Sequence, residues 1–145
     1  MIFVNGVWLG VDVGTVRVGV ARCDAAGILA TPLLTLARDR SADRDIAAVA
    51  ALVAEHGAAG VVIGLPITLA GQEGQSAQLA REYGLALAAL ISPVPVRYVD
   101  ERLTTVTAQR KLAQSGVRGS RAARAVVDQL AAVELLQHWL DSNSR

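Results

Sequence analysis

Three acidic residues lie in parts of the sequence that should face the protein core. Asp12 interrupts an apolar run at residues 7–13, and Glu101 follows a second apolar run at residues 94–99. Asp128 falls within the apolar register of the segment before the C-terminus. Burying a carboxylate costs free energy unless a positive group or a hydrogen-bond donor meets it. The three acids therefore predict one shared positive partner, most simply a divalent metal ion.

Carboxylates of this kind predict phosphodiester chemistry. Carboxylate oxygens suit Mg²⁺ or Mn²⁺, and these ions keep water molecules that a phosphate can displace. Two such ions about 4 Å apart can hold the attacking water and the leaving oxygen of a phosphodiester. Neither His56 nor His138 is well placed to act as a general base. We therefore expect a metal-bound water as the nucleophile, with Asp12, Glu101 and Asp128 as catalytic residues and metal ligands.

Positive charge is concentrated between two of these acids. The chain has a net charge of only +1, yet no acidic residue occurs between Arg102 and Val127. All but one of the 14 basic residues are arginines, whose guanidinium groups suit bidentate contacts with phosphate. The cluster is either a solvated helix surface or a phosphate-binding surface, and its position favours the second. The candidate phosphate contacts are Arg17, Arg102, Arg118, Arg121 and Arg124, of which Arg17 can alternatively pair with an acid.

Composition excludes several classes of protein. At 145 residues, 52% of them hydrophobic, the chain is long enough for one domain with a substantial core. A single cysteine, Cys23, excludes an intrachain disulfide and a Cys/His metal site. No window reaches the ~18 apolar residues of a membrane span, and the N-terminus lacks the features of a signal peptide. We expect one cytoplasmic domain over residues 1–145, frayed at 1–6 and 142–145.

Apolar runs and turn residues predict the elements that position these side chains. Two strands at residues 7–13 and 16–23 should be joined by a tight turn at Gly14-Thr15, and a third strand should cover residues 28–36. A helix should begin at an N-cap, Ser41, and end at Gly57. A strand, a loop, a helix and a strand are predicted next, at residues 60–65, 66–74, 75–91 and 94–99.

Two further helices complete the predicted order. One should begin at Thr104 or Thr105 and end near residue 116, and the other should cover residues 121–141. The predicted fold class is α/β, a mixed five-stranded sheet of three antiparallel and then two parallel strands, with helices on both faces. Ligands bind at the carboxyl ends of parallel strands, where Glu101 should lie. Asp128 shares its helix face with Ala132 and Leu135, so it should face the sheet.

Four motifs in this chain resemble those of the YqgF/RuvX family. They lie in order at residues 10–21, residues 62–66 with Gly71 and Gly74, residues 99–105, and residues 127–132 leading to Leu136-Gln137. The resemblance implies an RNase H-like fold and a nuclease that processes the 5′ end of pre-16S ribosomal RNA. It also places the family's acidic positions on Asp12, Glu101 and Asp128, with Asp100 as a substitute ligand.

Alternative functions remain open at this point. Members of the same family are also described as Holliday junction resolvase-like, and cutting branched DNA by paired nicks would require a homodimer. A non-catalytic nucleic-acid binding module is a third hypothesis, although three retained acids argue against it. The first motif also resembles the phosphate loop of actin-like kinases, but 145 residues cannot supply their two domains. The sequence does not distinguish RNA from DNA, because a metal site reads phosphate rather than sugar.

Overall fold

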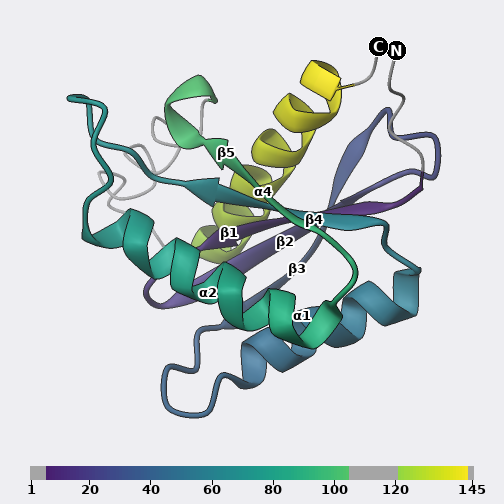
Figure 1. Cartoon of the computed structure of the whole chain (residues 1–145), viewed down its shortest axis with the longest axis horizontal. Coiled ribbons are helices and arrows are strands. Elements are labelled where there is room, and N and C mark those ends of the chain that lie inside the picture. Colours follow the sequence, from purple (N-terminus) through teal and green to yellow (C-terminus); the bar gives the residue numbers. More distant parts are fainter. Residues whose placement is uncertain (1–5, 105–120, 144–145) are drawn as a thin grey trace.

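A mixed five-stranded sheet forms the centre of the molecule (Figure 1). This computed structural model describes residues 6–104 and 121–143. The strands follow the spatial order β3-β2-β1-β4-β5 and comprise β1 (Trp8–Val13), β2 (Arg17–Cys23), β3 (Ala30–Ala37), β4 (Gly60–Leu65) and β5 (Val96–Asp100). The pairs β1–β2 and β2–β3 are antiparallel, whereas β4 is parallel to both β1 and β5. The predicted fold class is confirmed, and β1, which carries Asp12, is the central strand.

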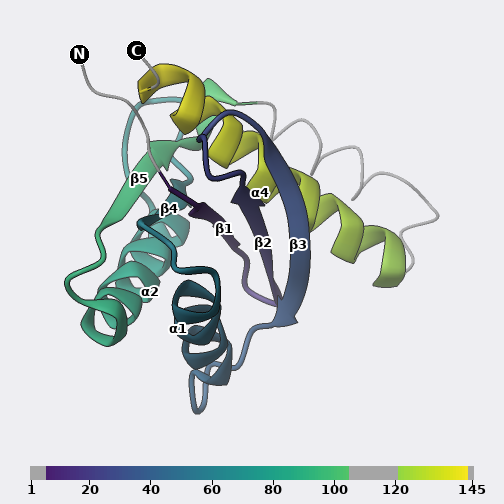
Figure 2. The same cartoon turned by 90° about the vertical axis from the view of Figure 1, so that its right-hand side faces the viewer.

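Helices cover both faces of this sheet. Helices α1 (Arg44–His56) and α2 (Gln75–Ile91) pack on one face, and α4 (Arg121–Asn143) crosses the other (Figure 2). A short 3-10 turn, η1 (Glu101–Leu103), follows β5. A further helix was predicted to start at Thr104 or Thr105. Apart from Thr104 itself, its residues lie outside the described part of the chain. In the described part of the chain, no helix has both the length and the apolar character that crossing a membrane requires.

Alternation along the strands sorts the apolar side chains into two cores. Leu9 and Val11 of β1 are fully buried in the core beneath α1 and α2. Ala132 and Leu136 of α4 belong to the opposite core, and they meet β1 at Gly10. Successive side chains of a strand point to opposite faces of a sheet. A residue's position in β1 therefore decides which helix layer it meets.

Two elements begin later than predicted, for local reasons. Helix α1 begins at Arg44, because the Ser41 hydroxyl donates to Asp39 at 2.8 Å and is used within the preceding loop rather than as an N-cap. Strand β5 begins at Val96, two residues later than predicted, because Pro95 has no N–H to donate to a neighbouring strand. In both places, local hydrogen bonding moved the boundary without changing the order of the elements.

Two other boundaries also differ from the prediction. Strand β3 begins at Ala30, because the N–H of Ile28 donates to the carboxylate of Asp24 at 2.7 Å and closes a turn. Helix α4 continues to Asn143, whose side-chain amide donates to the backbone carbonyl of Trp139 at 2.7 Å. Fraying was predicted from residue 142 onward, but residues 142 and 143 are helical.

Glycines in the central strands allow α4 to lie directly on the sheet. A Cβ atom at Gly19 of β2 would overlap the backbone oxygen of Asp128. A Cβ atom at Gly10 of β1 would lie 2.8 Å from the backbone oxygen of Ala132. Backbone atoms at such positions cannot move aside without shifting the helix, so any larger residue here would displace α4.

We expect Gly19→Ala to destabilise the protein by about 1–3 kcal/mol, because the added methyl group overpacks the contact between β2 and α4. The measurement is the free energy of unfolding from urea denaturation. Arg22→Ala on the same strand is the control, since Arg22 is exposed and its loss should change stability by less than about 0.5 kcal/mol. Equal stability of the Gly19→Ala and wild-type proteins would contradict this close approach.

Candidate active site

Asp12 lies on the face of the sheet that α4 covers. Its neighbour Val11 packs beneath α1 and α2, whereas Gly10, two residues before Asp12, meets Ala132 and Leu136 of α4. Because strand side chains alternate, Asp12 shares the face of Gly10. The side chain is almost completely buried, with 1% of the residue exposed. The acid at the end of the central strand therefore points into the layer between the sheet and α4.

Glycines on both sides of Asp12 bring the other two acids to the same region. Gly19 is paired directly with Asp12 on β2 and lies beneath the backbone of Asp128. On the other side, Gly64 of β4 lies beneath Glu101, since a Cβ atom there would be 2.8 Å from Glu101 Oε1. All three predicted acids therefore border one region at the carboxyl end of β1.

The three acids differ in burial and in their surroundings. Glu101 is 4% exposed at the first residue of η1, and its carboxylate packs near Leu135 of α4 over the same glycine. Asp128 is more open, with 14% of its side chain exposed. In this arrangement, no three His, Cys, Asp or Glu side chains of the described residues lie close enough together to hold one metal ion. The residue types suit a hard cation, but the set of three ligands is not assembled.

The third acid, Asp128, forms an ion pair with Arg17. Arg17 is the first residue of β2, directly after the hairpin turn, and its Nε donates to Asp128 Oδ2 at 2.7 Å. Of the two roles considered for Arg17, the structure shows the pairing with an acid. Arg124, one helical turn before Asp128, is exposed and has no ion pair within the described residues. Asp128 is therefore held by a residue 111 positions away in the sequence rather than by its helix neighbour.

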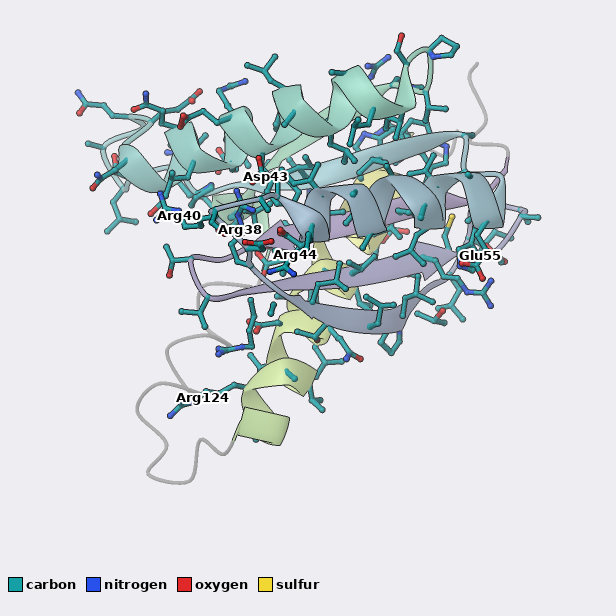
Figure 3. All side chains as sticks on the ribbon, turned by 90° about the horizontal axis from the view of Figure 1, so that it is seen from below. Arg38, Arg40, Asp43, Arg44, Glu55 and Arg124 are labelled. Atoms are coloured by element: carbon teal, nitrogen blue, oxygen red, sulfur yellow. The ribbon has the colours of Figure 1, made fainter. Side chains whose placement is uncertain are left out.

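A cavity of about 570 Å³ opens beside this ion pair. The hairpin turn between β1 and β2 forms one wall, the first turns of α2 form another, and the N-terminal half of α4 supplies Arg124, Val127 and Asp128. Figure 3 places Arg124 at the same end of the molecule as Arg38 and Arg40. The cavity therefore presents two arginines and one carboxylate at the edge of the region that the acids border.

The remaining predicted residues are placed differently. Asp100 is the last residue of β5 and shares the strand face of Tyr98, which packs against the core beneath α1 and α2, so it does not join the acids on the α4 face. Arg102 donates to Asp100 Oδ2 from Nη2 at 2.7 Å and from Nε at 3.0 Å. These hydrogen bonds hold the pKa of the Asp100 carboxyl below its usual range. Arg118 lies outside the described residues, and of Arg121 the structure describes only the helical backbone.

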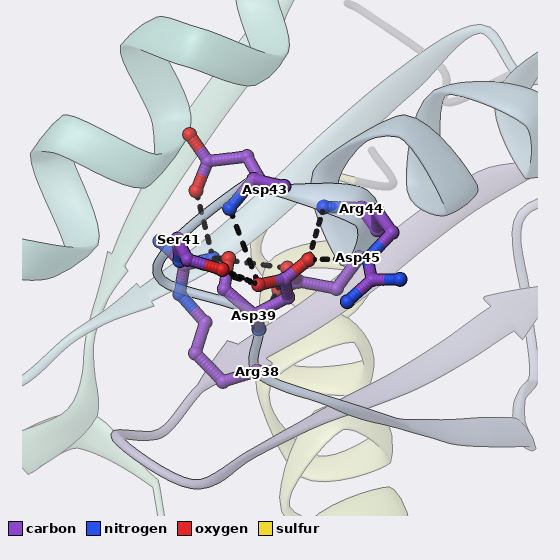
Figure 4. Close-up of polar contacts among 7 residues, drawn as sticks. Arg38, Asp39, Ser41, Asp43, Arg44 and Asp45 are labelled. Atoms are coloured by element: carbon purple, nitrogen blue, oxygen red, sulfur yellow. Dashed lines mark hydrogen bonds and ion pairs between the residues drawn. The ribbon is translucent and has the colours of Figure 1, made fainter.

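A fourth buried acid was missed by the sequence analysis. Asp45 of α1 has a side chain that is 1% exposed, and Arg38 Nη1 donates to its Oδ1 at 2.9 Å (Figure 4). The Arg38 guanidinium also lies 5.0 Å from the centre of the buried Tyr83 ring. The signal was available, because Asp45 stands four and eight residues before the buried Val49 and Val53, the same register that identified Asp128.

Comparisons with known proteins extend this geometry. The model of the RuvX family, described as Holliday junction resolvase, matches residues 6–142. A protein of Frankia casuarinae is 58% identical over 134 residues, which cover 92% of this chain and 66% of that protein. One of Mycobacterium tuberculosis is 57% identical over 133 residues, covering 92% of this chain and 77% of that protein. Both relatives carry the name "Putative pre-16S rRNA nuclease".

Solved structures share the fold at low sequence identity. Thermus thermophilus RuvC in complex with a Holliday junction substrate has a TM-score of 0.54 and 16% identity, and the match covers 96% of both chains. The fowlpox virus Holliday junction resolvase has a TM-score of 0.52 and 11% identity, over 94% of this chain and 99% of that one. These matches confirm the RNase H-like fold that the family resemblance implied.

We expect Asp45→Ala to destabilise the protein by about 2–3 kcal/mol, because it leaves the Arg38 guanidinium without its most buried partner. Glu55→Ala is the control on the same helix, where the acid is exposed (Figure 3) and the expected change is below about 0.5 kcal/mol. Urea denaturation measures both changes. Similar losses in the two variants would show that the Arg38–Asp45 contact does not stabilise the fold.

Proposed function

Because this chain belongs to the RuvX family, we propose that it is a metal-dependent nuclease that processes the 5′ end of pre-16S ribosomal RNA. The observation that carries the proposal is that Asp12, Glu101 and Asp128 border one region at the end of the central strand, beside a cavity lined by Arg17 and Arg124. The names of the Frankia and mycobacterial relatives support RNA as the substrate. The chain spans 66% of the first of these relatives and 77% of the second.

The three acids are the proposed ligands of Mg²⁺ or Mn²⁺. Bound there, such an ion would lower the pKa of a water molecule and so supply a nucleophile for the phosphodiester. Asp12 and Glu101 are buried beneath α4, which keeps bulk water away from their carboxylates. Arg17 and Arg124 line the adjacent cavity and are the proposed phosphate contacts. Arg102, Arg118 and Arg121 remain further candidates from the sequence. Phosphate contacts of this kind position a substrate without reading its sequence.

Cleavage of branched DNA is the alternative that the comparisons favour next. The family description names a Holliday junction resolvase, and the fold is shared with RuvC and with the fowlpox virus resolvase. A four-way junction is cut symmetrically when two active sites act together. The resolvase alternative therefore requires that the chain form a homodimer. A nucleic-acid binding module without catalysis is the remaining alternative, and it would be indifferent to chelators.

We expect Asp12→Asn to reduce cleavage by more than about 100-fold, because even changes around a metal's ligands cost 10- to 100-fold. The assay compares a 5′-extended 16S ribosomal RNA precursor with a four-way DNA junction, in Mg²⁺, in Mn²⁺ and in EDTA. Circular dichroism and urea denaturation check that the variant folds. Full activity of folded Asp12→Asn, or cleavage by the wild type in EDTA, would overturn the metal-dependent nuclease; preferential junction cleavage would favour the resolvase.

Glu101 and its neighbour Asp100 allow a matched test of which acid is the ligand. We expect Glu101→Gln to reduce cleavage as strongly as Asp12→Asn, whereas Asp100→Asn should retain most activity because Asp100 lies on the other face of the sheet. The same precursor cleavage assay measures both variants at equal protein concentration. The reverse result, with activity lost in Asp100→Asn and kept in Glu101→Gln, would assign the ligand role to Asp100.

A further inference from the structure

One oxygen of Asp128 is already bound by a positive side chain in this structure. We propose that Arg17 and the divalent ion compete for the Asp128 carboxylate, and that the guanidinium released by the ion binds a phosphate of the substrate. Arg17 would then couple metal binding to substrate binding. The inference rests on the proposed function, since it takes Asp128 as a ligand.

The contact between these two residues is of a kind that can be broken. Arg17 binds Asp128 through Nε at 2.7 Å, and no second hydrogen bond from the guanidinium to this carboxylate occurs in the described structure. The pair is also open to solvent, with 27% of the Arg17 side chain and 14% of the Asp128 side chain exposed. Ion pairs that are single and partly exposed contribute little net free energy. A divalent ion can therefore displace the guanidinium.

The backbone around the pair indicates which partner moves. Asp128 is fixed, because its backbone oxygen lies directly on Gly19 of β2. Arg17 begins β2 beside the hairpin turn, and its long side chain has several rotatable bonds. The cavity of about 570 Å³ that both residues line gives the guanidinium space to turn away from Asp128. Release of the pair therefore requires a side-chain rotation rather than a movement of α4.

Electrostatic forces would turn the Arg17 guanidinium away from Asp128 and toward a phosphate. Asp12, Glu101 and Asp128 bring three carboxylates to one region, and Arg17 offsets part of that negative charge. A divalent ion at the same carboxylates would repel the nearby guanidinium, most strongly where water is excluded. A phosphate entering the cavity would attract it, because the planar guanidinium matches two phosphate oxygens. Metal and substrate therefore act on Arg17 in the same direction.

Arg124 provides a matched control within the same cavity. It lines the cavity one helical turn from Asp128, it is exposed, and it has no ion pair within the described residues. Both arginines should contribute to RNA binding, but only Arg17 should affect the metal directly. Arg17→Gln and Arg124→Gln remove the same charge and leave side chains of the same kind.

The experiment measures Mn²⁺ binding by calorimetry without nucleic acid, and binding of a 5′-extended 16S precursor RNA by fluorescence anisotropy in EDTA. We expect Arg17→Gln to bind Mn²⁺ about threefold to fivefold more tightly than the wild type, as relief of a partly exposed ion pair permits. Arg124→Gln should leave Mn²⁺ affinity unchanged. In EDTA, Arg124→Gln should bind RNA more weakly and reduce the slope of log affinity against log salt by about 1, whereas Arg17→Gln should weaken RNA binding less, because without metal the wild-type Arg17 guanidinium stays paired with Asp128.

Unchanged or weaker Mn²⁺ binding by Arg17→Gln would overturn the competition, as would an equal gain in Arg124→Gln. A second measurement uses the wild type alone: the Arg17 Nε–H resonance should shift when Mg²⁺ is added, and a resonance that does not shift would also overturn the inference. Asp12→Asn separates this inference from the proposed function. Loss of Mn²⁺ binding in Asp12→Asn, with no gain in Arg17→Gln, would leave the metal site standing and remove only the competition; no Mn²⁺ binding by the wild type would overturn both.

Discussion

The close approach of α4 to the sheet is the constraint on which the candidate site depends. Gly10 and Gly19 have no side chains between the sheet and the α4 backbone, so the helix lies directly on β1 and β2. Asp128 thereby reaches the end of β1, although it is 116 positions after Asp12 in the sequence. A third glycine, Gly64, leaves the corresponding space for Glu101 on the other side. The glycines of the central strands therefore leave the space in which α4 and Glu101 approach the sheet.

Most of the fold could be predicted because its signals are local. The bounds of β4 and α2 were predicted correctly, since Gly60–Leu65 is a short apolar run and Gln75–Ile91 is a helical pattern between a glycine and a proline. The predicted start of β3 was wrong because a side chain accepts a hydrogen bond from the backbone there: the N–H of Ile28 donates to the carboxylate of Asp24. A competing hydrogen bond of this kind depends on loop geometry, and hydrophobic periodicity carries no information about it.

The candidate site could be predicted only in part. The apolar run around Asp12 and the helix register of Asp128 identified both as acids facing the core. In the structure Asp12 is buried beneath α4, whereas Asp128 lies on α4 itself with 14% of its side chain exposed. The partner of Asp128 could not be predicted, because Arg17 lies 111 positions away and meets it only through the packing of β2 against α4. The same register also pointed to Asp45, which shows that a core-facing acid alone does not indicate a metal.

Asp45 and Asp128 show what separates a structural acid from a functional one. Each accepts a hydrogen bond from one arginine, at 2.9 Å for Arg38 and 2.7 Å for Arg17. The Asp45 side chain is closed off at 1% exposure, and Arg38 Nη1 also donates to Asp43 Oδ1 at 3.0 Å. Because the Asp45 carboxylate is inaccessible to a ligand, breaking its contact with Arg38 only costs stability. The Asp128 contact borders a cavity large enough for a phosphate group, at the end of β1 where Asp12 and Glu101 also lie. Access to a ligand, rather than burial, is therefore the property that makes an arginine–carboxylate pair able to take part in chemistry.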